Sequence, residues 1–158
     1  MYCDEDYLEI REMAGKFADS EVAPLAADIA KNKKIPQELI DKLAENGFLG
    51  IFIPEEYGGS DMDYVSYAII VEELSRACAS TGVFVSAHSS LCTWPILHYG
   101  SEEQKKKYLP KLASGEMIGC FSLSEPNAGS DAGSLTTFAE NKGEYYELTG
   151  GKNWITNG

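Results

Sequence analysis

Hydrophobic residues recur every three to four positions from the start of the chain to about Gly115. This spacing places them on one face of a helix, and glycine, proline and capping residues divide the run into separate helices. The predicted helices cover residues 6–30, 36–47, 63–79, 80–98 and 101–115. Pro24 is expected to kink or divide the first helix, because proline removes a backbone donor.

Three of the predicted helices carry specific expectations. The helix over 80–98 is apolar or small almost all round, so we expect other helices to enclose it. Ser101, with Gln104 three residues later, predicts a capping box at the start of the last helix. The helix over 63–79 has one face expected to be buried, which comprises Tyr64, Tyr67, Ala68, Val71, Leu74 and Cys78.

The hydrophobic period changes from helical to strand-like at Met117. Four short strands are predicted, at Ile118–Glu125, Leu135–Glu140, Glu144–Leu148 and Lys152–Thr156. The predicted fold class is therefore α+β. An N-terminal all-α helical bundle over residues 1–115 is followed, over 116–158, by the first strands of an incomplete antiparallel β-barrel or sandwich domain. Four strands leave an open sheet edge, so we expect the chain to stop in mid-domain.

Composition and charge exclude several kinds of partner. The formal net charge of −12 disfavours contact with nucleic acid, and no apolar run approaches the length needed for membrane insertion. The acidic N-terminus argues against a signal or transit peptide. The cysteines fit neither a metal pattern nor a disulfide framework, so a reducing compartment is indicated and we expect the protein to be cytoplasmic. They are Cys3, Cys78, Cys92 and Cys120.

Isolated titratable residues give weak signals. His88 and His98 have no carboxylate at ligand spacing, so a structural, hydrogen-bonded role is favoured for each and no metal site is predicted. The adjacent pair Glu55 and Glu56 is set aside as an acid–base pair, because neighbouring residues on a loop point apart.

The strongest chemical signal is the stretch from Phe121 to Ser134, where glycine and small polar residues crowd together after a predicted strand. Such a loop can turn several backbone N–H groups toward one point, as phosphate-binding loops do. An ordinary turn has the same composition and is favoured on composition alone. A second segment, Gly150 to Gly158, then places the aromatic ring of Trp154 and the hydroxyl of Thr156 two residues apart.

The two segments together resemble the flavin-binding signature of the acyl-CoA dehydrogenase family. The matching stretches are Leu-Ser-Glu-Pro-Asn-Ala-Gly-Ser-Asp from Leu123 to Asp131, and Trp-Ile-Thr-Asn from Trp154 to Asn157. Earlier stretches agree with this resemblance: 54–59, 71–74 and 100–109. The resemblance covers almost the whole chain, and the chain covers well under half of a typical family member.

The resemblance implies that FAD lies against the β-domain and that an acyl-CoA thioester is oxidised at its Cα–Cβ bond in fatty acid metabolism. The residues implied to bind FAD are Phe121, Leu123, Ser124, Gly129, Ser130, Trp154, Ile155 and Thr156. The residues implied to bind substrate are Ser130, Phe84, Ala87 and Leu91, and a bulky Phe84 suggests a short or medium acyl chain. Without the resemblance, Trp154 and Thr156 are interpreted as ordinary strand residues.

The resemblance also implies that this chain lacks the catalytic base. The family's catalytic glutamate lies in a C-terminal helical domain, so no catalytic residue is predicted here and Glu125 is not taken as the base. We expect this chain alone to be inactive and to hold FAD weakly or not at all. Electron-transfer flavoprotein is the implied partner, and a homotetramer the implied assembly of a complete member.

Three alternatives remain open at this point. The first is a flavin oxidase or monooxygenase on the same fold, which would form peroxide rapidly. The second is a non-catalytic, truncated interaction module that does not bind FAD. The third is an enzyme made naturally in two pieces.

Overall fold

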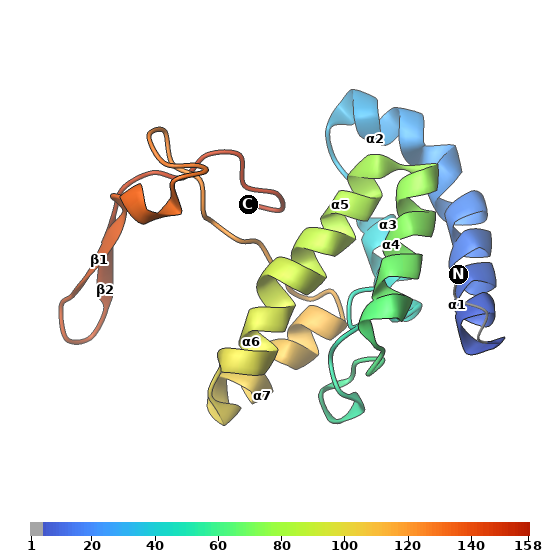
Figure 1. Ribbon diagram of the computed structural model, residues 1–158, viewed down its shortest axis with the longest axis horizontal. Coiled ribbons are helices and arrows are strands. Elements are labelled where there is room, and N and C mark those ends of the chain that lie inside the picture. The colour runs from blue at the N-terminus through green and yellow to red at the C-terminus, as the bar shows by residue number, and fades with distance from the viewer. Residues whose placement is uncertain (1–4) are drawn as a thin grey trace.

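The computed structural model describes residues 5–158, so Cys3 and the other first residues lie outside it. Figure 1 shows the two parts of the molecule: a group of packed helices, coloured from blue to the light orange of the last helix, and a darker orange-to-red segment that leaves the helices and ends beside them. This confirms the predicted fold class, a helical bundle followed by antiparallel strands.

The predicted first helix is divided near Pro24. Its parts are α1 (Glu5–Phe17), a π-helical turn (Ala18–Val22), a 3-10 turn (Ala23–Leu25) and α2 (Ala26–Asn32). Pro24 has no N–H to donate to the preceding turn, which explains why the regular helix stops before it and resumes after it.

The next two helices have proline, glycine or capping residues at their ends. Helix α3 (Gln37–Glu45) starts directly after Pro36, and Gly47 follows it with a φ of 75°, a conformation that glycine adopts easily. Helix α4 (Tyr64–Ala77) is capped by Asp63, whose side chain accepts the Ser66 N–H at 2.8 Å.

The predicted long helix over 80–98 consists of three segments. They are α5 (Ala79–Ser86), a π-helix (Ala87–Thr93) and α6 (Trp94–Tyr99). Helix α7 (Glu102–Ala113) follows, and the predicted capping box is confirmed, because the Gln104 N–H donates to Ser101 and the Ser101 N–H donates to Gln104.

The core lies between α1, α3, α4 and α5. Fully buried side chains at its centre are Leu39, Leu43, Phe48, Leu49, Ile51, Ile70 and Leu74. Helices α1 and α4 are joined at their edge by Glu73, which is 8% exposed and accepts from Arg11 at 2.7 Å and from Arg76 at 2.9 Å. A buried carboxylate with two guanidinium partners keeps its charge compensated.

Two burial predictions are wrong. In the 80–98 region Val83 is 53% exposed and Leu91 is 46% exposed, because the other helices do not enclose this run on every side. Leu91 lines the cavity beside the C-terminal segment. In α4, Tyr64 is 60% exposed because its ring lies at the surface end of the helix, where its hydroxyl accepts the Trp94 indole N–H at 2.8 Å. Ala68 of the same predicted face is also exposed, because the buried face of α4 includes Ile69, Ile70 and Glu73 instead.

Two of the four predicted strands form. Strands β1 (Phe138–Asn141) and β2 (Tyr146–Thr149) pair antiparallel, with Phe138 opposite Thr149. They overlap the second and third predicted strands, and each ends one residue later than predicted. Figure 1 shows them as the hairpin farthest from the helices.

The first and fourth predicted strands, 118–125 and 152–156, do not form as strands. They run beside each other but share a single backbone bond, from the Asn153 N–H to the Ser124 carbonyl at 2.8 Å. Trp154 has a φ of 60°, which interrupts an extended backbone and prevents a continuous ladder.

Three further observations bear on the expected chemistry. Among residues 5–158, no helix combines the length and apolarity needed to cross a bilayer. In the same part of the chain, no three His, Cys, Asp or Glu side chains come close enough together to hold a metal ion. Cys78, Cys92 and Cys120 are free thiols.

Candidate functional site

A cavity of about 260 Å³ lies where the C-terminal segment returns to the helices. Its lining residues are Ala87, Leu91, Phe121, Leu123, Ser124, Trp154, Ile155 and Thr156. The lining contains no Asp, Glu, His, Lys or Arg, so its polar groups are two hydroxyls, the indole N–H of Trp154 and backbone groups.

The cavity has two walls that come from distant parts of the sequence. The helix wall is the π-helix Ala87–Thr93, whose widened turns present Ala87 and Leu91. The opposite wall is made of segments 121–124 and 154–156, which the bond from Asn153 to Ser124 holds together. We call these the helix wall and the loop wall.

Glu125 fixes the loop wall from behind. Its side chain is 3% exposed and accepts the Thr136 N–H at 2.7 Å, the Thr137 N–H at 3.0 Å and the Lys152 ammonium at 2.8 Å. The Lys152 ammonium also donates to the Leu123 carbonyl at 3.1 Å. One buried ion pair therefore connects both segments of the loop wall to the start of the hairpin.

These contacts determine the ionisation of Glu125. The Lys152 ammonium and the N–H groups of Thr136 and Thr137 hold the pKa of this carboxyl far below its ordinary value. A carboxylate whose charge is so strongly stabilised is a poor proton acceptor at neutral pH. Glu125 is therefore a structural anion, which agrees with the expectation that it is not the catalytic base.

His88 connects the helix wall to the core. The Gly119 N–H donates to its Nδ1 at 3.0 Å, so the proton is on Nε2, which donates to the Leu49 carbonyl at 3.1 Å. The ring is fully buried, and burial lowers the pKa of the imidazole. His88 is therefore a neutral, structural histidine, as its sequence context favoured.

The groups that face the cavity suit a flat aromatic ligand with polar edges. Trp154 is 94% exposed and lies at the cavity. Within residues 5–158, the hydroxyls of Ser124 and Thr156 make no hydrogen bond and remain available as donors. An uncovered indole can stack on a ring, and two free hydroxyls beside it can bind polar atoms at the ring's edge.

The structure brings most of the predicted site residues together and leaves three apart. Eight of them line this one cavity. Phe84 is 7% exposed and its side chain packs in the core instead. Gly129 and Ser130 are exposed on the loop that follows Pro126, away from the lining, and Gly129 does not take the positive φ that its type would allow.

The sequence interpretation missed two residues that hold the site in place. The sequence pattern predicts Lys152 only as the start of a strand, although a buried carboxylate such as that of Glu125 needs a cationic partner. Asn157 enters the sequence prediction only as the end of a motif, although asparagine is among the few residues that tolerate a left-handed backbone. Its φ is 65°.

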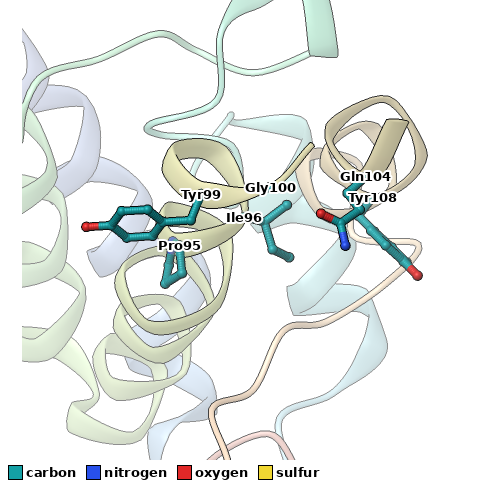
Figure 2. A pocket seen from close by; sticks show the side chains of 6 residues that line it. All are labelled: Pro95, Ile96, Tyr99, Gly100, Gln104 and Tyr108. Carbon is teal, nitrogen blue, oxygen red and sulfur yellow. The ribbon is translucent and has the colours of Figure 1, made fainter. Parts of the chain in front are cut away.

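A second pocket lies between the end of α6 and α7, and Figure 2 shows the side chains around it. It is lined by Pro95, Ile96, Tyr99, Gly100, Gln104 and Tyr108. The Gln104 side-chain oxygen is already used by the capping box, and no acid or base lines the pocket. It contains no predicted site residue.

Comparison with known proteins identifies the class of both parts of the chain. Residues 4–116 match the family model "Acyl-CoA dehydrogenase, N-terminal domain", and residues 120–158 match "Acyl-CoA dehydrogenase, middle domain". A helical domain followed by the beginning of this middle domain defines a class of oxidoreductase. The chain belongs to the acyl-CoA dehydrogenase family.

Individual relatives agree with the family models. The short-chain specific acyl-CoA dehydrogenase of Clostridium acetobutylicum is 48% identical over 94% of this chain and 39% of its own length. A structure described under electron transferring flavoprotein of Acidaminococcus fermentans has a TM-score of 0.93 and 46% identity, with 100% of this chain and 42% of that chain covered.

A third relative is the acyl-CoA dehydrogenase of Bacillus anthracis, whose structure is described as complexed with FAD. It has a TM-score of 0.91 and 39% identity, with 98% of this chain and 27% of that chain covered. In all three comparisons the chain spans less than half the length of the protein it matches.

Proposed function

We propose that the cavity is part of the FAD site of an acyl-CoA dehydrogenase that oxidises a short- or medium-chain acyl-CoA thioester. The observation that carries this proposal is the convergence of Phe121, Leu123, Ser124 and the Trp154–Thr156 segment on one cavity beside the helix wall. Family membership supports the cofactor, and a Bacillus anthracis relative is described as an FAD complex.

The residues present fit a flavin ring. The exposed Trp154 indole would cover one face and keep water away from it. The free hydroxyls of Ser124 and Thr156, with backbone N–H groups of the loop wall, would donate to polar atoms at the ring's edge. When bound, FAD would supply the electron acceptor that no side chain of this cavity provides.

The helix wall is the proposed contact for the acyl chain. Ala87 and Leu91 line the cavity opposite Trp154 and present only apolar atoms, which suit a hydrocarbon tail. Phe84 lies behind this wall in the core, so its bulk would act on the acyl chain through the position of the wall. Ser130, on the exposed loop, would lie toward the CoA part of the substrate.

The proton acceptor is proposed to be a carboxylate that is not among residues 5–158. The cavity lining contains no acid or base, and Glu125, close to it in sequence, is held as an anion by Lys152. The lining therefore excludes water and positions the reactants, while proton transfer requires a group from outside this part of the protein.

A chimaera tests the proposed activity. The 158 residues are joined after Gly158 to the remaining sequence of the Clostridium acetobutylicum relative, and oxidation of butyryl-CoA is followed with an artificial electron acceptor. The chimaera is expected to turn over butyryl-CoA, and the chain alone is not. An inactive chimaera that is folded and loaded with FAD would contradict the proposed activity.

Electron-transfer flavoprotein is the proposed electron partner. One structural relative, with a TM-score of 0.93, is described under that protein's name. The active chimaera is expected to reduce electron-transfer flavoprotein faster than it reduces oxygen, and rapid peroxide formation would instead indicate an oxidase.

A further inference from the structure

Asn157 connects the end of the loop wall to two other segments of the chain. Its side-chain Nδ2 donates to the Phe84 carbonyl in α5 at 3.1 Å and to the Gly119 carbonyl at 3.1 Å. The two donors of one amide group are thus both used, and both bonds cross between parts of the chain that are far apart in sequence.

The backbone conformation at Asn157 does not by itself require asparagine. Its φ of 65° is left-handed, which asparagine tolerates and glycine adopts without strain. Glycine would therefore satisfy the backbone equally well. What asparagine adds is the amide that reaches Phe84 and Gly119.

The backbone around Gly119, to which the Asn157 amide donates, is itself held by the helical domain. The Gly119 carbonyl accepts from Asn157, while the Gly119 N–H donates to His88, which donates to the Leu49 carbonyl in the core. A Cβ at Gly119 would lie 2.5 Å from the Cβ and Sγ of Cys92, so this backbone packs directly on the π-helix. The Asn157 amide is consequently attached to rigid parts of the helical domain.

The position of Asn157 determines what these bonds control. Thr156, Ile155 and Trp154 precede it directly and form the loop wall, whereas Ala87 and Leu91 form the helix wall a few residues after Phe84. At its other end the 154–156 segment is held by Asn153 and Lys152, whose hydrogen bonds in the described part of the chain go to residues 123–125. Asn157 is therefore the attachment of this segment to the helices.

We infer that Asn157 is a positioning residue that sets the separation of the helix wall from the loop wall, and through it the acyl-chain length that the cavity accepts. This inference rests on the proposed function for its substrate. Loss of the amide would leave Trp154–Thr156 without these two bonds to the helical domain, so the segment would open more readily from Ser124 and shift relative to Ala87 and Leu91.

The first experiment uses the 158-residue chain itself and needs no cofactor. Hydrogen exchange of backbone N–H groups is compared between the chain, Asn157→Gly and Asn157→Asp, with Asn46→Ala as the matched control. Asn46 also donates its amide to a backbone carbonyl, that of Lys42, but on the exposed end of α3. Asn157→Asp keeps the size and tolerance of a left-handed backbone but has no donor when ionised.

Both Asn157 variants are expected to raise the exchange rate of the Asn153 N–H by about tenfold or more, because removing about 1.4 kcal/mol of local stability changes an equilibrium tenfold. Exchange of core amides such as that of Ile70 is expected to stay unchanged in both variants. The control Asn46→Ala is expected to change neither the exchange of Asn153 nor that of Ile70. Unchanged exchange at Asn153 in both Asn157 variants would overturn the positioning role, whether or not the protein binds flavin.

The second experiment uses the chimaera and measures kcat and KM for acyl-CoA thioesters from butyryl to octanoyl. Asn157→Gly is expected to change the ratio of kcat/KM between the longest and shortest substrates by about three- to tenfold, the size of one or two lost hydrogen bonds. A purely structural loss would lower kcat/KM equally for all chain lengths, and that uniform result would overturn the specificity role. An unmodified chimaera without activity would count against the proposed function, and the exchange experiment would still decide the positioning role.

Discussion

His88 shows how one buried side chain can make stability depend on pH. In the folded protein its Nδ1 accepts from Gly119, so protonation of that nitrogen would replace an acceptor with a second donor. Burial lowers the pKa of the imidazole below its ordinary value near 6.5. The unfolded chain then binds a proton at a higher pH than the folded protein does.

The sign of the effect follows from linkage. The His88 contribution to stability is fully present above pH about 6.5 and is lost as pH falls from there toward the lower folded pKa. We expect the free energy of unfolding, measured with urea, to decrease between pH 7 and pH 5. His88→Ala should lower it at pH 7 by about 1–3 kcal/mol, because two buried backbone groups lose a partner, and should reduce this pH dependence. A variant with the same slope as the unaltered chain would contradict the assignment.

Glu125 is expected to make stability depend on pH in a lower pH range than His88 does. Its folded pKa is far below the ordinary carboxyl value of about 4.3, so its contribution to stability is present above pH 4.3 and is lost as pH falls through the range below it. Glu125→Gln should lower the thermal unfolding midpoint at pH 7 by leaving the Lys152 ammonium without its charge partner. Between pH 5 and pH 3 the variant should lose less stability than the unaltered chain, as measured by thermal unfolding at each pH.

Single residues also mark the limit of what the sequence could predict about the site. The family resemblance, and not the residue types alone, implies that Ser124, Trp154 and Thr156 contact a flavin ring, and these residues do line one cavity. The amide contacts of Asn157 could not be predicted, because they depend on where the carbonyls of Phe84 and Gly119 lie in the folded chain. Phe84 was expected at the substrate, but helix packing turns its ring into the core.

At the scale of elements, the helices follow local signals closely. The capping box at Ser101 is an example, because its two reciprocal bonds involve residues only three apart in sequence. Such contacts need no tertiary partner, which explains why helix starts were predictable while the burial of Tyr64 and Leu91 was not.

The capping box gives a testable magnitude. Ser101→Ala should lower the free energy of unfolding by about 1 kcal/mol, because the Gln104 N–H at the start of α7 loses its acceptor. Ser80→Ala is the control, since Ser80 is exposed in the first turn of α5 and its hydroxyl makes no hydrogen bond within residues 5–158. This control should change stability by less than about 0.5 kcal/mol in urea unfolding.

The strands were harder to predict than the helices. Alternation suggested four, yet only β1 and β2 find a partner with a matching register. Segment 118–125 and segment 152–156 have suitable residues, but Trp154 at a φ of 60° breaks the extended conformation that a ladder needs. A strand depends on a neighbour far along the chain, and periodicity alone does not contain that information.

At the scale of the whole molecule, the two parts differ in how their apolar residues are placed. The helical part buries its hydrophobic residues in one main cluster and a smaller one near α7. In the C-terminal part large apolar side chains are exposed, among them Phe138, Leu148 and Trp154. The cavity lies where these two parts meet, so its shape depends on the few bonds that join them, above all those of Asn157 and Gly119.

The central claim is that the loop wall binds a flavin ring, and the visible absorption spectrum of the chimaera tests it most directly. After incubation with FAD and gel filtration, the chimaera is expected to carry about one flavin per chain, and its visible band should bleach when butyryl-CoA is added. Trp154→Ala should hold the flavin more weakly, because the indole is the largest exposed ring at the cavity. A folded chimaera that leaves the column colourless would contradict the claim.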